Sequence, residues 1–109
     1  MAAANINSDS LPCIFCEKNF KHITLYEKPR TIQQLAECGG LDLNFTPSRA
    51  IHCSTYGNWG STVLDEDNEK LHFIICDKCV KERVHLMIYE QRGGDIINAA
   101  KILLDDKAY

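Results

Sequence analysis

The sequence contains no apolar stretch that approaches membrane-spanning length, and its first residues show neither the basic nor the apolar segment of a signal peptide. We therefore expect a cytoplasmic protein without a membrane anchor. An excess of positive charge is also missing, because 12 Lys and Arg stand against 15 Asp and Glu, for a formal net charge of -3. Proteins that bind a phosphate backbone mainly by electrostatics carry a basic footprint, so nucleic-acid binding is an alternative and not the favoured function.

Familiar enzyme signatures are missing as well. The chain has no G-x-S-x-G, no P-loop, no H-E-x-x-H and no zinc-deaminase pattern. We therefore do not expect catalysis. A weaker alternative is an enzyme whose site lies near His52, Cys53 and Asp65.

Cysteine is the residue type that this short chain does have, with six copies in 109 residues. Four of them form two C-x2-C pairs, Cys13 with Cys16 and Cys76 with Cys79. Two thiolates at this spacing point inward from one tight backbone turn, here called a knuckle, and two knuckles supply the four soft ligands that tetrahedral zinc prefers. We expect one structural Zn²⁺ on these four cysteines. Four thiolates leave the ion no open position for activating water.

Other arrangements of the cysteines stay open at this point. Six cysteines would allow three disulfides, although the missing export signal argues against an oxidising compartment, and the two pairs would alternatively bind nothing together. Cys38 and Cys53 are most simply small core residues, but either would replace a knuckle ligand in a different set. His52 adjoins Cys53, and the two either join a second metal site or form a buried, hydrogen-bonded pair.

Composition predicts a single domain with a short polar tail ahead of it. With 45% hydrophobic and 25% charged residues, the chain has ordinary globular composition and room for one core. We expect residues 1–10 to be a disordered tail, because unattached chain ends are commonly poorly ordered. Residues 11–109 are expected to form one zinc-binding domain.

Local patterns predict the elements of the first three quarters of the chain. Thr31 and Gln34 form a capping-box pattern, so a short helix is expected over residues 32–38, ended by Gly39 and Gly40. The other expected elements are a short strand within residues 19–26 that ends at Lys28 and Pro29, a strand over residues 41–45, a shaped loop over residues 52–65 and a strand over residues 71–76.

Helical spacing of apolar residues predicts two helices at the end of the chain. The first runs from Lys78 to about Gln91, and Gly93 and Gly94 stop it; the second begins after Asp95. The expected fold is therefore α+β, a small zinc-stapled domain of the treble-clef or zinc-ribbon type, with short strands and two C-terminal helices. The second knuckle would stand at the start of the first of these helices.

Two groups of residues are candidates for a binding surface. Tyr56 and Trp59 would present aromatic rings to a partner, although packing over the knuckles is the simpler interpretation. Lys78, Lys81 and Arg83 follow the second knuckle and would contact phosphates if the chain binds nucleic acid. The neighbouring acidic residues favour an ordinary solvated helix face.

A set of motifs resembles that of small, largely uncharacterised bacterial and bacteriophage zinc-finger proteins. The motifs are the first C-x2-C pair, His52-Cys53, Tyr56-Gly57, Gly60-Ser61, Asp65, and the run Phe73-Ile74-Ile75-Cys76-Asp77-Lys78-Cys79-Val80. The likeness covers residues 13–16 and about 52–84, and Asn58-Trp59 interrupts the Tyr-Gly-Ser run of that group. The resemblance implies zinc binding in a bacterial or phage setting and carries no activity.

These observations together favour a structural-zinc module that works by binding rather than catalysis. We expect it to act as an adaptor or regulator that docks on a protein partner or on another copy of itself. The second of the two helices expected at the end of the chain supports this, because its apolar residues offer more apolar surface than a short tail needs.

Overall fold

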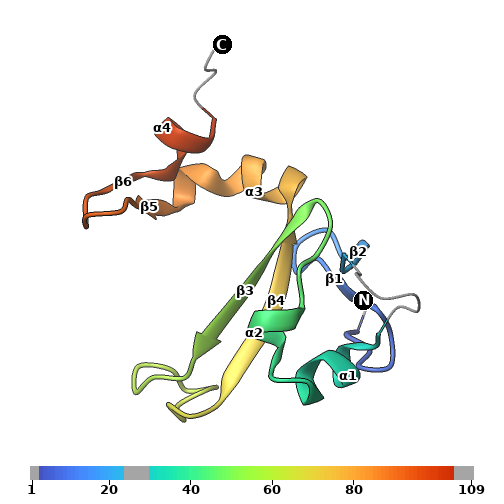
Figure 1. Ribbon diagram of the computed structural model, residues 1–109. Coiled ribbons are helices and arrows are strands. Elements are labelled where there is room, and N and C mark those ends of the chain that lie inside the picture. Colours follow the sequence, from blue (N-terminus) through green and yellow to red (C-terminus); the bar gives the residue numbers. More distant parts are fainter. Residues whose placement is uncertain (1–2, 24–29, 105–109) are drawn as a thin grey trace. The chain divides into compact units, whose positions relative to one another are not determined.

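The structure, a computed structural model, describes residues 3–23 and 30–104. Within these residues the chain is an α+β protein of short antiparallel strand pairs and short helices, which confirms the predicted class (Figure 1). It divides into two compact units, Met1–Cys76 and Asp77–Tyr109, which are described separately below. No helix in the described part is long and apolar enough to cross a membrane.

The first unit begins with a two-stranded sheet. Strand β1 (Ser10–Pro12) pairs antiparallel with β2 (Asn19–Lys21), and the first knuckle lies in the connection between them. The strand predicted within residues 19–26 therefore starts where expected but is short. Its predicted end at Lys28 and Pro29 lies outside the described residues.

Helix α1 (Ile32–Glu37) confirms the capping-box prediction. The Thr31 hydroxyl accepts a hydrogen bond from the Gln34 backbone N–H at 3.1 Å, and the Gln34 side chain accepts one from the Thr31 backbone N–H at 2.9 Å. Both N–H groups would otherwise lack a partner at a helix start. Gly39 and Gly40 follow with φ of 114° and 102°, a region that costs glycine little.

The segment before β1 makes backbone contacts with α1. The carbonyl oxygen of Ser8 accepts a hydrogen bond from the Ile32 N–H at 2.8 Å, and that of Ile6 accepts one from the Gln33 N–H at 3.0 Å. These bonds satisfy two further N–H groups at the start of the helix. Part of the predicted tail, residues 1–10, thus has partners in this structure.

The strand predicted over residues 41–45 is wrong, because Leu41–Asn44 form helix α2. Leu41 and Phe45 are four residues apart, a spacing that places both side chains on one face of a helical turn. Phe45 is buried, and Leu43, which a strand would bury with it, is 81% exposed. The alternating apolar pattern was a coincidence of a short segment.

Asn44 explains why the helical form is preferred. Its side-chain amide donates hydrogen bonds to the carbonyl oxygens of Leu35, Cys38 and Gly40 at 3.0 to 3.1 Å. Carbonyl groups at the end of a helix lack partners within that helix, so the amide completes the end of α1 and joins α2 to it.

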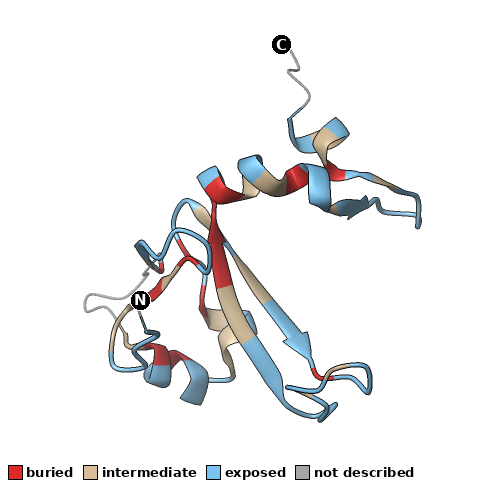
Figure 2. Ribbon diagram, turned by 180° about the vertical axis from the view of Figure 1, so that it is seen from behind, coloured by how far each residue is buried: buried red, intermediate tan, exposed pale blue. Residues whose placement is uncertain are grey.

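Strands β3 (Ala50–Tyr56) and β4 (Lys70–Cys76) form the longest antiparallel pair. The strand predicted over residues 71–76 is confirmed, whereas the first part of the loop predicted over residues 52–65 is strand. Because side chains alternate between the two faces of a pair, the even-numbered positions of both strands share one face, beside which α2 lies (Figure 1). Burial increases along β4 toward its last three residues (Figure 2).

The hydrophobic core of the first unit collects side chains from all of its elements. Its buried residues are Leu11, Ile32, Leu35, Phe45 and Ile74. Phe20, Leu41 and Ala50 pack against them. Ile74 is 0% exposed, so the middle of β4 is anchored in this core.

The second unit differs from the two helices predicted at the end of the chain. Helix α3 begins at the predicted place but ends early, and a strand pair lies between the two helices. Its elements are α3 (Asp77–Arg83), the 3-10 turn η1 (Val84–Leu86), β5 (Ile88–Glu90), β6 (Ile96–Asn98) and α4 (Ala99–Leu103).

The strand pair forms because Gly93 and Gly94 reverse the chain rather than simply ending a helix. Their φ angles are 104° and 98°, values that suit glycine in hairpin turns. The Gln91 N–H donates to the Asp95 carbonyl at 2.8 Å and closes the turn. The β-branched Ile88 next to an aromatic residue also favours a strand, which spacing alone did not reveal.

The loop after β3 depends on Gly57, and this gives a first prediction. A Cβ atom at residue 57 would lie 2.3 Å from the Glu66 carbonyl oxygen and 2.7 Å from that of Leu64. We expect Gly57→Ala to lower the free energy of unfolding by about 1–3 kcal/mol, the usual range for overpacking. Denaturant unfolding followed by circular dichroism measures this.

Gly60→Ala is the matched control in the same loop. Its Cβ would meet only the Asn58 side-chain oxygen, at 3.1 Å, and that side chain is able to move. Equal unfolding midpoints for Gly57→Ala and Gly60→Ala would contradict the role given to Gly57.

Candidate metal centre

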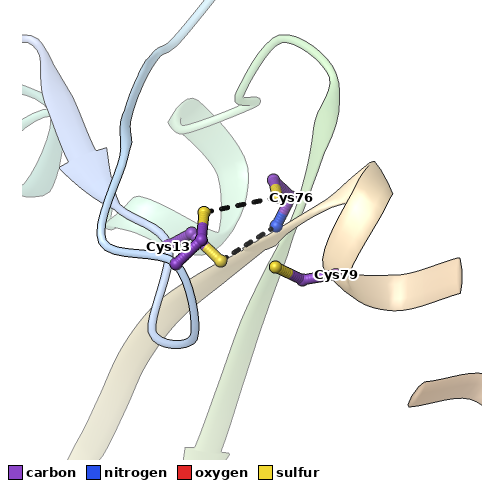
Figure 3. A group of neighbouring side chains, drawn as sticks. Cys13, Cys76 and Cys79 are labelled. Carbon is purple, nitrogen blue, oxygen red and sulfur yellow. Dashed lines mark hydrogen bonds between the residues drawn. The ribbon is translucent and has the colours of Figure 1, made fainter. Parts of the chain in front are cut away.

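The structure brings the two predicted knuckles together. The sulfur atoms of Cys13, Cys16, Cys76 and Cys79 all lie within 4.8 Å of one another. Figure 3 shows three of these side chains facing one another, Cys13 from the first knuckle and Cys76 and Cys79 from the second. The two pairs stand 60 positions apart in the sequence, so only the fold joins them.

The first knuckle is a tight turn held against β4. The Cys13 N–H donates to the Lys18 carbonyl at 2.8 Å, and the Glu17 N–H donates back to the Cys13 carbonyl at 2.9 Å. Cys13 also forms a parallel bridge with Ile74, where the Ile14 N–H donates to the Ile74 carbonyl at 3.1 Å. The buried centre of β4 therefore fixes the position of the knuckle.

The second knuckle is positioned by the end of a strand and the start of a helix. Cys76 is the last residue of β4, and Cys79 lies in the first turn of α3. Both are buried, as is Cys13, whereas Cys16 is exposed. Three of the four sulfurs are thus shielded from water.

Hydrogen bonding prepares Cys13 for the thiolate form that binds metals. Burial raises the pKa of its thiol, but backbone N–H groups of Cys16, Cys76 and Phe15 and the Cys16 side chain act against burial and lower the pKa to about 6. Two of these bonds, from Phe15 and Cys76, are 3.4 Å long. Donors that favour the charged form lower a pKa in this way.

Tetrahedral zinc fits this group of sulfurs. Zn–S bonds of about 2.3 Å place neighbouring sulfurs about 3.8 Å apart, and the Cys16 and Cys76 sulfurs are 3.7 Å apart. That separation is far longer than the roughly 2 Å of a disulfide bond. The four cysteines therefore form a candidate metal site. Four thiolate ligands would leave a tetrahedral ion no open coordination position at which chemistry could take place.

The other two cysteines lie outside this site. Cys38 is exposed, with its sulfur 3.0 Å from the Arg30 guanidinium, so its prediction as a core residue is wrong. Cys53 is half-buried, and burial raises the pKa of its thiol. It follows His52 in β3, so the two side chains point to opposite faces. His52 and Cys53 therefore do not face a common site, as the alternative enzyme site near His52, Cys53 and Asp65 would require.

A second group of potential metal ligands lies on the even-numbered face of β3 and β4. Ligand atoms of Asp42, His52 and His72 lie within 4.8 Å of one another. His52 Nε2 is 3.0 Å from His72 Nδ1, which is 3.8 Å from Asp42 Oδ1. Sequence patterns assign no role to Asp42 or His72, because only the pairing of β3 with β4 makes His52 and His72 neighbours on one face.

Charge around this second group is set mainly by Lys70. Its ammonium group contacts the Asp42 carboxylate, and hydrogen bonds from Lys70 and Ser54 lower the pKa of Asp42 to about 2. The same ammonium lies 4.6 Å from the ring centre of Tyr56. Burial, followed by the proximity of His52, lowers the pKa of His72.

The predicted surface residues are largely accessible. Tyr56 is 54% and Trp59 97% exposed, so the expected packing over the knuckles is wrong. Lys78 and Lys81 are exposed on α3, whereas Arg83 is partly exposed and 3.5 Å from Glu82. A depression in the loop after β3 is lined by Trp59, Ser61, Asp65, Glu66 and Asp67.

Comparison with known proteins adds no relative to this picture. No protein-family model matches the chain, and no curated protein or solved structure is significantly similar to it. The resemblance to bacterial and phage zinc-finger proteins therefore stays a prediction that rests on the quoted motifs.

The ion pair of Asp42 with Lys70 gives the second prediction. We expect the Asp42 carboxyl to titrate near pH 2, well below its ordinary pKa of 3.8. Because its folded-state pKa is lowered, the ion pair stabilises the fold above the ordinary pKa, and this stabilisation is lost as the pH falls toward 2. The carboxyl ¹³C shift of Asp42, followed by NMR against pH, measures this.

Lys70→Met should move the Asp42 titration back toward 3.8, since it removes the largest cause of the shift. Lys81→Met, which changes an exposed lysine of α3, is the control and should leave it unchanged. A wild-type midpoint near 3.8 would show that this ion pair does not form in solution.

Proposed function

We propose that this protein is a zinc-stapled binding module without catalytic activity at its cysteine site. The observation that carries the proposal is the convergence of four cysteine sulfurs, from two distant C-x2-C pairs, within 4.8 Å. The ion is Zn²⁺, because four thiolates at tetrahedral spacing suit zinc and provide no open position. It serves as a structural link between the knuckle after β1 and the junction of β4 with α3.

The order of elements supports a treble-clef arrangement for this module. A knuckle, the hairpin of β3 and β4, and then helix α3 follow one another in the chain, with the last two cysteines at the start of the helix. A zinc-ribbon arrangement would place the second pair in another knuckle between strands. The location of Cys79 in a helical turn favours the treble clef.

Exposed apolar side chains of the second unit support a role in protein binding. Leu86 is 75%, Ile88 73% and Ile96 57% exposed. Because Ile88 pairs with Asn98 and Glu90 with Ile96, the two isoleucines share one face of the β5 and β6 pair. We propose that this face, on which Glu90 and Asn98 lie beside the two isoleucines, binds another copy of the chain, since one face is able to match itself around a two-fold axis.

Nucleic-acid binding ranks below this function. The candidate helix α3 carries Lys78, Lys81 and Arg83, but Glu82 pairs with Arg83 and Asp77 opens the first turn. Acidic groups among the basic ones weaken the attraction for a phosphate backbone.

The zinc proposal predicts metal loss in cysteine variants. The wild-type chain should hold zinc at this site, and Cys76→Ser should lose that zinc and its fold. Metal binding contributes about 10–16 kcal/mol in small zinc domains, which matches or exceeds the roughly 5–15 kcal/mol net stability of a typical protein. Elemental analysis and circular dichroism measure the two losses.

Cys38→Ser is the matched control, because Cys38 is exposed and lies outside the cluster. It should keep both metal and fold. A Cys76→Ser variant that retains the zinc content and secondary structure of the wild type would remove the four-cysteine site from the proposal.

The binding proposal predicts self-association through the β5 and β6 face. We expect Ile88→Lys combined with Ile96→Lys to weaken association at least about 100-fold, because burial of one isoleucine contributes about 1.5–3 kcal/mol. Sedimentation velocity over a range of protein concentrations measures the dissociation constant. Leu43→Lys, at an 81% exposed position of the first unit, is the control. A wild-type chain that stays monomeric at every concentration would overturn this proposal.

A further inference from the structure

We propose that Asp42, His52 and His72 form a second metal site, which binds a divalent transition-metal ion such as Zn²⁺ separately from the four cysteines. All three residues lie in the first unit, on α2, β3 and β4. Their ligand atoms lie within 4.8 Å of one another. The proposal adds a site with open coordination positions to a protein whose cysteine site has none.

Strand register brings the two histidines together. His52 pairs with Ile74, and His72 pairs with Ser54, so the histidines are diagonal neighbours on the same face. His52 Nε2 and His72 Nδ1 are 3.0 Å apart. Two nitrogen ligands on tetrahedral zinc, with Zn–N bonds of about 2.0–2.1 Å, are about 3.3 Å apart. A shift of a few tenths of an ångström therefore gives the spacing of a bound ion.

The contacts of His52 fix which of its nitrogens is available. Nδ1 lies 3.0 Å from the Phe45 carbonyl oxygen, which only accepts hydrogen bonds, so Nδ1 carries the proton and donates it. Nε2 of the neutral ring then holds a lone pair directed at His72. Metal-binding histidines typically donate their second nitrogen to a carbonyl or carboxylate in this way. The Phe45 ring also lies edge-on to His52, with centres 5.4 Å apart, and helps to hold it.

Asp42 supplies the third ligand from the other side. Its Oδ2 contacts the Lys70 ammonium, which leaves Oδ1 directed toward His72 Nδ1 at 3.8 Å. That separation is too long for a hydrogen bond. Without a metal, the Nδ1 proton of His72 makes the hydrogen bond to His52 Nε2. If that proton moves to Nε2 of His72, lone pairs of His72 Nδ1, His52 Nε2 and Asp42 Oδ1 face one small space. A cation bound there would satisfy all three at once.

The donor set indicates the kind of ion. Imidazole suits zinc, iron, copper and nickel, and two histidines with one carboxylate form a recurring three-ligand set for zinc and iron. Three protein ligands leave at least one position of the ion for water or another small ligand. Asp42 is exposed and both histidines are only partly buried, so solvent reaches the site.

Metal titration of the full chain tests this site beside the cysteine centre. With Co²⁺ as the probe, cysteine ligands give a charge-transfer band in the near ultraviolet, whereas a site of nitrogen and oxygen ligands gives only weak visible bands. We expect the wild type to bind two equivalents. His72→Gln and Asp42→Asn should each lower the affinity for the second Co²⁺ ion by more than about 100-fold. Residues that only orient a metal ligand change the affinity by about 10–100-fold.

His85→Gln is the matched control, because His85 is an exposed histidine of the second unit. It should bind two equivalents. In every variant, the charge-transfer band reports the cysteine site and circular dichroism reports the fold. If His72→Gln does not fold, Asp42→Asn still tests the site, because it changes an exposed side chain. One equivalent in the wild type, or a second equivalent that persists in folded His72→Gln and Asp42→Asn, would overturn the proposal.

Discussion

The contact of the first knuckle with the end of β4 is the constraint on which the rest of the structure depends. It joins residues 60 to 63 positions apart, and closing a loop of this length costs about 4 kcal/mol of chain entropy. The hydrogen bonds that join the first knuckle to β4 contribute only about 1 kcal/mol each to stability. The four-thiolate ion that we propose would stabilise this contact more than those hydrogen bonds do, and it would fix where α3 begins.

Strand β4 contributes to both groups of potential metal ligands. His72, Ile74 and Cys76 alternate along it, so a histidine of one group, the centre of the hydrophobic core and a cysteine of the other group share one face. Ile74 is fully buried between them. The core therefore positions one member of each group through a single strand. Within each group, the potential ligand atoms lie within 4.8 Å of one another.

Prediction from sequence succeeded where the signal is local. The capping box of α1, strand β4 and the two knuckles each depend on neighbouring residues. It failed at α2, where Asn44 bonds to the end of α1, and at residues 84–98, where a hairpin turn and strand pairing replace helix. The group of Asp42, His52 and His72 was missed for the same reason: its members meet only after α2 lies beside paired strands, and no spacing in the sequence records that approach.

The separation of 3.0 Å between His52 and His72 makes the histidine pair a reporter of how the hairpin is aligned. A slip of β3 by one residue would turn His52 to the far face and bring Ile51 or Cys53 in its place. The two imidazole rings would then lie on opposite faces of the strand pair and would no longer be in contact. A direct coupling between their nitrogens would thus distinguish the correct alignment from a slip of one residue in either direction, and loss of that coupling would mark the fraction of a folding population with such a slip.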